Sequence, residues 1–302
     1  MLALAAAGSV FAIACAHAQD LEPRAYSASP IGTNFLVAGY SHTSGRVSLD
    51  PSLPITGVKA AIDTYALGYD HTFALAGRAA RASLLLPYFD GNLSGQVQEQ
   101  GARATRLGPG DLRLRFSVNL LGGPALTPAA FAQRTPTPTL GVSLIVIAPS
   151  GAYDPQRLVN ISSNRWAVRP EIGLSVPLGQ WFADASFGTW IFTDNNNFFH
   201  GHVRSQLPIY SVQVHGGYNF RPGLWLAADA TYFTGGETSI DGVGKHDIQA
   251  NSRYGLTLSV PLTASWSTKL SWSTWLTGRN NAYQTVGLTL QYRWFNRPLA
   301  AR

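Results

Sequence analysis

The sequence has little charge and almost no cysteine. Asp, Glu, Lys and Arg make up 13% of the 302 residues, about half the share of an ordinary soluble domain. The single cysteine, Cys15, lies in an apolar N-terminal stretch. The rest of the chain therefore has no disulfide, no thiolate metal site and no cysteine nucleophile.

Long apolar runs are also missing after residue 18. A membrane-spanning helix needs roughly 20 consecutive apolar residues, and the mean hydropathy of the chain is only +0.01. The formal net charge is +6, but Lys and Arg are scattered without a basic run. These features exclude a helical membrane protein and argue against nucleic acid as a partner.

Residues 1–18 have the pattern of an export signal. Leu2 to Ala14 is apolar, and Ala16-His17-Ala18 supplies a small-x-small site that predicts cleavage before Gln19. No Lys or Arg precedes the apolar stretch, so the true start codon can lie upstream. The stretch ending at Cys15 also resembles a lipoprotein signal, but it lacks the usual leucine, and cleavage after Ala18 is the preferred interpretation.

The last long stretch, 282–295, has a side-chain period of two, which is the period of a β-strand. One parity is apolar and ends in aromatics: Val286, Leu288, Leu290, Tyr292 and Trp294. The other parity is small or polar: Thr285, Gly287, Thr289, Gln291 and Arg293. Such a strand fits either a wall between lipid and water or the solvated outer face of a soluble sandwich.

Similar runs recur along the chain, each long enough to cross a membrane obliquely as a strand. We read twelve of them, at 33–48, 60–73, 78–97, 110–121, 138–149, 164–177, 181–193, 207–221, 224–235, 251–261, 266–277 and 282–295. Tight connections at 74–77, 178–180, 222–223 and 262–265 alternate with polar loops at 49–59, 98–109, 150–163, 194–206 and 236–250; the segment 122–137 is a long exception among the turns.

This alternation of connection length is typical of a transmembrane barrel with short periplasmic turns and long outer loops. A soluble sandwich has no reason to show it, so the sequence predicts an all-β fold, a closed antiparallel transmembrane barrel of about 12 strands. An even strand count places both termini in the periplasm. The expected organisation is a signal at 1–18, a periplasmic lead at 19–32, the barrel at 33–295 and a periplasmic tail at 296–302. A lead folded into the lumen is the alternative for 19–32.

The parity of the strands sorts side chains between lipid and lumen. Aromatic residues near strand ends are expected in the interfacial girdles: Trp166, Trp181, Phe220, Trp225, Tyr254, Trp266, Tyr292 and Trp294. The candidates for the lumen are Arg113, Arg115, Arg165, Arg169, Glu171, Asp184, Gln213, His215, Asp229, Arg253, Lys269, Gln291 and Arg293. Basic groups outnumber acidic ones, which favours a mildly anion-selective passage unless each Arg is neutralised locally.

Several blocks in the second half of the chain together resemble one bacterial family. They are Arg165-Trp166 with Arg169-Pro170-Glu171-Ile172-Gly173, Phe192-Thr193-Asp194-Asn195, Gln206-x-Pro208-x-Tyr210 with His215-x-x-Tyr218, Gly235-Gly236-x-Thr238-x-x-Asp241-Gly242, Asn251-Ser252-Arg253-x-Gly255 with Pro261-Leu262, and Gln291-Tyr292-x-Trp294. The family is named for a putative MetA pathway of phenol degradation, and its members are described as transporter-like outer-membrane proteins. The resemblance extends loosely to Gly108-x-Gly110-Asp111. It implies an outer-membrane location and suggests an aromatic solute, but it assigns no functional residue.

The resulting hypothesis is a gated or narrow outer-membrane channel for small, aromatic or anionic solutes, acting as a monomer, with the lipid bilayer as its other partner. A structural or adhesive barrel without transport is the alternative. A lipid-acting enzyme is less favoured, since His202 and Ser205 lie in an expected loop and lack the spacing of a Ser-His site. The polar loops at 194–197 and 241–247 lack a twelve-residue calcium pattern. The glycines of Gly108-Pro109-Gly110 and Gly235-Gly236 are typical of turns rather than phosphate cradles. No cofactor or metal is therefore expected.

Overall fold

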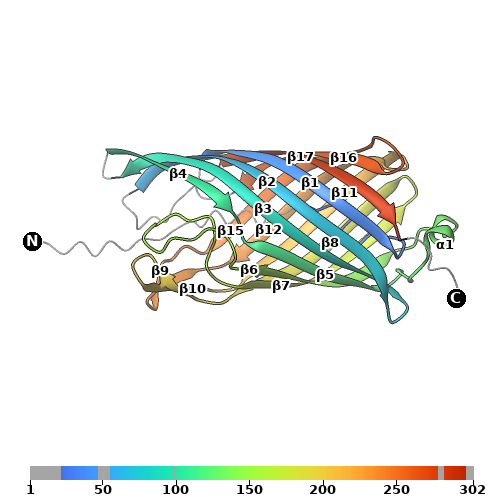
Figure 1. Cartoon of the computed structure of the whole chain (residues 1–302), viewed down its shortest axis with the longest axis horizontal. Helices are drawn as coiled ribbons and strands as arrows, with labels where there is room; N and C mark the ends of the chain where they lie inside the picture. Colours follow the sequence, from blue (N-terminus) through green and yellow to red (C-terminus); the bar gives the residue numbers. More distant parts are fainter. Residues whose placement is uncertain (1–21, 47–54, 98–99, 278–281, 297–302) are drawn as a thin grey trace, which may run out of the picture.

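The computed structural model describes residues 22–46, 55–97, 100–277 and 282–296. Within these ranges, twelve antiparallel strands follow one another around a closed barrel (Figure 1). They are β1 (Thr33–Arg46), β2 (Ile55–Leu75), β3 (Arg78–Val97), β5 (Leu112–Leu121), β6 (Thr139–Ala148), β7 (Ala167–Leu178), β8 (Trp181–Phe192), β11 (Ile209–Arg221), β12 (Leu224–Gly235), β15 (Gln249–Pro261), β16 (Trp266–Thr277) and β17 (Ala282–Phe295). β1 pairs with β17 from Thr33↔Phe295 to Arg46↔Ala282, which closes the ring. The predicted fold class is confirmed.

The period of two in the sequence becomes two faces of one wall. Along β7 and β11, buried and exposed side chains alternate strictly over most of each strand. Exposed outward-facing side chains are large and apolar on every side of the barrel, among them Leu36, Leu67, Leu114, Ile172, Val212, Leu256, Leu270 and Leu288. Each of the twelve described strands of the ring pairs with a neighbour on both sides, and an apolar band around a closed ring is suited to lipid.

One end of the barrel, called the turn end here, carries the short connections. Residues 76–77, 179–180 and 222–223 join strands in tight hairpins, and Gly77, Gly179 and Gly223 adopt φ of 76, 68 and 80°. A non-glycine residue is strained at such positive φ, so glycine is favoured at these turns. The longer connection between β5 and β6 holds the short helix α1 (Pro128–Ala132), which lies at the turn end (Figure 1). No helix among the described residues is long and apolar enough to cross a membrane.

The opposite, loop end is more ordered than the sequence predicted. The expected loop 98–109 contains β4 (Gln100–Pro109), which pairs with the outer half of β3. The expected loops 194–206 and 236–250 contain β9 (Asn195–Phe198), β10 (His202–Gln206), β13 (Thr238–Ile240) and β14 (Val243–Gly244), which form a separate four-stranded sheet. These strands hold few large apolar residues, so no hydrophobic alternation marked them.

β4 and β5 run in the same direction and pair with successive halves of β3, with a break at Gly110 and Asp111. Asp111 is 2% exposed and holds the loop 149–166 beside this break. Its carboxylate accepts hydrogen bonds from the backbone N–H of Gly151 at 3.0 Å and of Ser163 at 3.1 Å. One buried acid therefore fastens the longest loop to the barrel wall.

The predicted signal at 1–18, the first residues of the lead and the tail beyond Asn296 lie outside the described residues. The rest of the lead is placed differently from the expectation. Residues 22–32 do not form a segment outside the barrel, because Tyr26 is 4% exposed and bonds to inward-facing side chains of β6 and β7. The prediction of a periplasmic lead is wrong for residues 22–32, which lie in the lumen as the alternative proposed. Gly, Pro and Ser around Tyr26 gave no periodic signal for either location.

Candidate solute pathway in the barrel lumen

Tyr26 lies in a slot of the barrel wall. Its hydroxyl donates a hydrogen bond to Oε1 of Glu171 at 2.7 Å and shares another with Oγ of Ser143 at 2.8 Å. The ring covers Gly141 and Gly173, which are opposite each other on β6 and β7. A Cβ built on Gly173 would lie 2.1 Å from a ring atom, and one on Gly141 would lie 2.7 Å away. The two glycines therefore provide the space that the ring fills.

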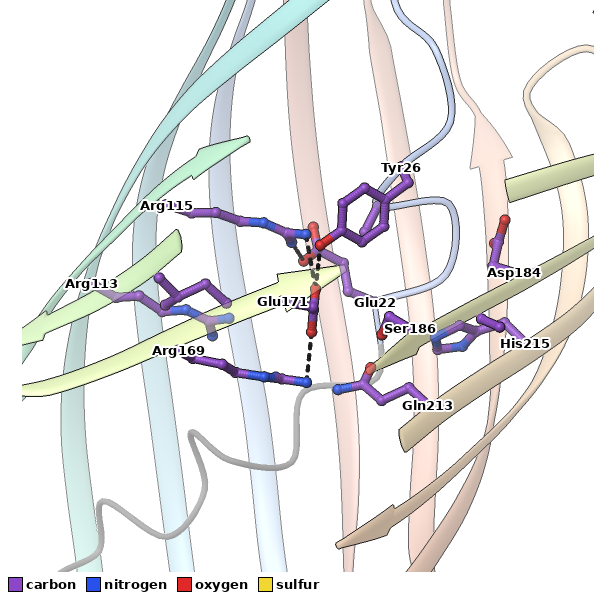
Figure 2. A pocket seen from close by; sticks show the side chains of 13 residues that line it. Glu22, Tyr26, Arg113, Arg115, Arg169, Glu171, Asp184, Ser186, Gln213 and His215 are labelled. Atoms are coloured by element: carbon purple, nitrogen blue, oxygen red, sulfur yellow. Dashed lines mark hydrogen bonds and ion pairs between the residues drawn. The ribbon is translucent and has the colours of Figure 1, made fainter. Parts of the chain in front are cut away.

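Charged side chains surround this slot (Figure 2). Arg115 pairs with Glu22 at 2.6 Å and with Glu171 at 3.4 Å, while Arg169 pairs with the other oxygen of Glu171 at 2.6 Å. The guanidinium of Arg115 also lies 5.3 Å from the centre of the Tyr26 ring. Two arginines and two carboxylates thus form one network that includes the N-terminal segment. We call Gly141, Ser143, Glu171, Gly173 and Arg115 the Tyr26 slot.

A second group of contacts fastens the same segment at Arg24. The backbone N–H of Arg24 donates to Oδ2 of Asp184 at 2.8 Å, and its guanidinium donates to Oδ1 of Asn219 at 2.9 Å. That guanidinium also lies 4.9 Å from the ring of Phe182 and 5.9 Å from the ring of Trp225. The segment is therefore bonded to the inner face of β5, β6, β7, β8 and β11, which are consecutive strands of the wall.

The structure brings seven of the thirteen predicted lumen residues together around one cavity. This cavity contains about 380 Å³ of space, part of it continuous with solvent, and Glu22 and Tyr26 of the N-terminal segment also line it (Figure 2). The seven are Arg113, Arg115, Arg169, Glu171, Asp184, Gln213 and His215. Arg113, Arg169, Glu171, Gln213 and His215 are all less than 9% exposed. Ionic and amide groups from β5, β7, β8 and β11 thus meet at mid-barrel.

Three further predicted residues face the lumen but do not line the cavity. Asp229 is 3% exposed and accepts hydrogen bonds from Nδ1 of His215 and Oγ1 of Thr257, both at 2.7 Å. Arg165 bonds to Gln206 and lies 4.3 Å from the Phe192 ring. Arg253 donates to Oγ of Ser273 at 2.6 Å and lies 5.8 Å from the Trp275 ring.

The remaining three predicted residues are not among those that line the cavity. The ammonium of Lys269 lies 5.9 Å from the Trp225 ring, and Gln291 is half-buried on β17. Arg293 is exposed at the turn end, where it donates to the carbonyl of Ala264 at 2.8 Å. Arg293 therefore holds a hairpin turn, since its side chain reaches the neighbouring connection instead of the solute path.

Sequence reasoning missed an aromatic layer inside the barrel. Trp190 is 1% exposed and Phe233 is 0% exposed, and both pack with Ile145, Ile147 and Ile209 against Phe192 and Trp275. Trp225, expected in a girdle, is also buried in the lumen, where its ring packs on Phe182. The parity of β8 already placed Trp190 on the same face as Asp184. An assignment of polar residues alone to the lumen leaves Trp190 out.

The histidine and serine of the expected loop do not meet. His202 pairs through Nδ1 with Asp241 at 2.5 Å, whereas Ser205 lies on β10 opposite Ser239. The backbone N–H of Val203 and the ring of His202 hold the pKa of Asp241 below its usual range. In the described part of the chain, no group of three or more His, Cys, Asp or Glu side chains could hold a metal ion.

Residues 39–294 match the family model described as "Putative MetA-pathway of phenol degradation". Among solved structures, an outer membrane channel from Pseudomonas putida F1 is similar, with 24% identity, a TM-score of 0.77, and coverage of 91% of this chain and 100% of that one. The beta domain of the Bordetella autotransporter Brka aligns with 12% identity and a TM-score of 0.53 over 87% of this chain and 100% of that one. No curated protein sequence matches the chain.

Proposed function

The chain belongs to the family described as putative MetA-pathway of phenol degradation, and from that premise we propose that it is a narrow, gated outer-membrane channel for small solutes. The family description supports an aromatic solute. The observation that carries the proposal is the place of residues 22–32, which lie inside the polar lumen and are bonded to its wall. In the proposal, this segment obstructs the passage.

Such an obstruction can be removed without unfolding the barrel. The segment joins the wall through side-chain hydrogen bonds and ion pairs at Glu22, Arg24 and Tyr26. The wall itself is held by hydrogen bonds between neighbouring strands. A barrel of twelve strands is narrower than an open porin of 16–18 strands. Movement of a short segment therefore decides between a closed and an open passage.

The middle of the passage and its loop end differ in chemistry. The slot and its ion pairs occupy the middle, and the aromatic layer of Trp190, Phe233 and Trp275 lies on β8, β12 and β16 nearer the loop end. Arg165 and Arg253 lie over aromatic rings in this region. Aromatic faces attract both planar apolar solutes and cations, so this layer suits a small aromatic molecule entering from outside.

One observation favours a structural barrel without transport. Glu171 pairs with Arg169 on its own strand β7 and with Arg115 on β5, two strands away, and in a structural barrel these pairs stiffen the wall. In that case the N-terminal segment would be a permanent part of the interior. The two functions differ in whether removal of the segment creates a conducting path.

The test is the ionic conductance of refolded protein in planar bilayers. Wild-type protein should show small or infrequent openings, and a variant lacking residues 22–30 should conduct several-fold more. Both proteins must show the heat-modifiable gel migration of a folded barrel. A folded deletion variant without conductance would assign the barrel a structural role.

A further inference from the structure

We propose that the Tyr26 slot is a binding site for neutral phenols, and that a phenolic solute opens the passage by replacing the Tyr26 side chain. The proposal deepens the channel function and rests on it for its biological role. Its basis is that the tyrosine side chain is itself a phenol, and the wall recognises each part of it.

The shape of the slot is the first argument. Gly141 and Gly173 face each other across β6 and β7, and a Cβ on either would collide with the ring. Neither glycine has the positive φ that would require glycine for backbone reasons. At both positions the missing side chain therefore serves to admit a flat ring against the wall.

The hydroxyl is recognised separately from the ring. It donates to the carboxylate of Glu171 at 2.7 Å and meets Ser143 at 2.8 Å. Arg115 lies near the ring at 5.3 Å and pairs with Glu171 at 3.4 Å, which orients the carboxylate as an acceptor. Hydrogen bonds to a charged partner are stronger than those between neutral groups.

This arrangement selects among aromatic solutes. A neutral phenol supplies the proton that Glu171 accepts. Toluene would leave Glu171 and Ser143 without that partner, and buried polar groups left unpaired strongly disfavour such an analogue. A benzoate would place a second negative charge against Glu171. The site therefore prefers phenols to aromatic acids. The excess of arginines in the lumen favoured small anions, and the slot restricts the proposed solutes to neutral phenols.

The position of the tether defines the ligand further. Tyr26 joins the backbone through the ring carbon opposite its hydroxyl, so a phenol with a small substituent at that position has the same outline. The tethered side chain competes with it at the high effective concentration of an intramolecular group. Wild-type protein should consequently bind p-cresol weakly, and removal of the Tyr26 side chain should expose the full affinity of the slot.

The experiment measures p-cresol binding by titration calorimetry to refolded full-length protein in detergent, with empty micelles subtracted. Tyr26→Ala should bind p-cresol at least tenfold more tightly than wild type, and it should bind toluene and 4-methylbenzoate at least tenfold more weakly than p-cresol. Adding Gly173→Val to Tyr26→Ala should abolish binding, because the new side chain fills the slot. Adding Gly216→Ala instead should not change it, since a Cβ there meets nothing within 4 Å.

Equal affinity of Tyr26→Ala and of its Gly173→Val derivative for p-cresol, or equal affinity for toluene and p-cresol, would overturn the site. Should Tyr26→Ala not refold, Tyr26→Phe replaces it. This variant loses only the hydroxyl and must bind p-cresol more tightly than wild type; unchanged affinity overturns the proposal. Binding is measured without a membrane, so a protein that binds p-cresol but never conducts would contradict only the channel function.

Discussion

The change Gly173→Ala tests directly whether the N-terminal segment closes the lumen. In the structure, a Cβ at this position would lie 2.1 Å from one carbon of the Tyr26 ring and 2.2 Å from another. Carbon atoms in contact are ordinarily about 3.5–4.0 Å apart. The ring must therefore move by more than about 1 Å, and its hydroxyl then leaves hydrogen-bond range of Glu171.

The size of the effect follows from what Tyr26 loses. A buried aromatic side chain contributes roughly 1.5–3 kcal/mol, and a hydrogen bond to a charged group contributes about 1.5–3 kcal/mol. Loss of the bond to Glu171 with part of the burial destabilises the seated position by about 3 kcal/mol. Since every 1.4 kcal/mol is a factor of ten, the ratio of displaced to seated Tyr26 rises about 100-fold.

The assay is the open probability of single channels in planar bilayers. Gly173→Ala should raise it strongly while leaving the heat-modifiable migration of the barrel unchanged. The matched control is Gly216→Ala, a glycine on the outward face of β11 whose Cβ would meet no atom within 4 Å. If both variants gate like wild type, Tyr26 does not close the passage and the reasoning fails.

Three further outcomes are expected. Leu288→Arg, on the lipid face, should lower the free energy of unfolding by about 2–4 kcal/mol, and Thr289→Arg by far less; equal effects in urea titrations of bilayer-inserted protein would contradict the two faces. Replacing Glu22 and Glu171 together with Gln should move the reversal potential in a salt gradient toward anions, because Arg115 and Arg169 then lose their counter-charges, whereas an unmoved potential would place these groups off the ion path. The pKa of Asp241 lies below its ordinary 3.8 because Val203 and His202 bond to its carboxylate. Its stabilisation of the four-stranded sheet at the loop end is therefore present above pH 3.8 and is lost as the pH falls through the lowered pKa. Amide exchange in β10 and β13, relative to intrinsic rates, should rise over this pH range in wild type but stay independent of pH in Asp241→Ala.

The sequence alone determined the barrel, because the barrel depends on local patterns. Alternation along segments such as 207–221 specifies strands with one apolar face, and the alternation of short and long connections specifies an up-and-down order. Parity also placed Arg169 and Glu171 on the inner face. These properties follow from the period of a strand and require no knowledge of which strands lie opposite one another.

Only the tertiary structure decided what fills the interior. The segment at 22–32 has no period, so its place in the lumen depends on contacts with residues more than 100 positions away, such as Tyr26 with Ser143 and Glu171. The role of Gly141 and Gly173 was equally hidden, because a glycine in a strand shows a space only when the ring that occupies it is known. The parity of a residue determines which face of the wall its side chain lies on, but its contacts depend on how the barrel closes. The ion pairs of Arg115 with Glu22 and Glu171 are decided by that closure.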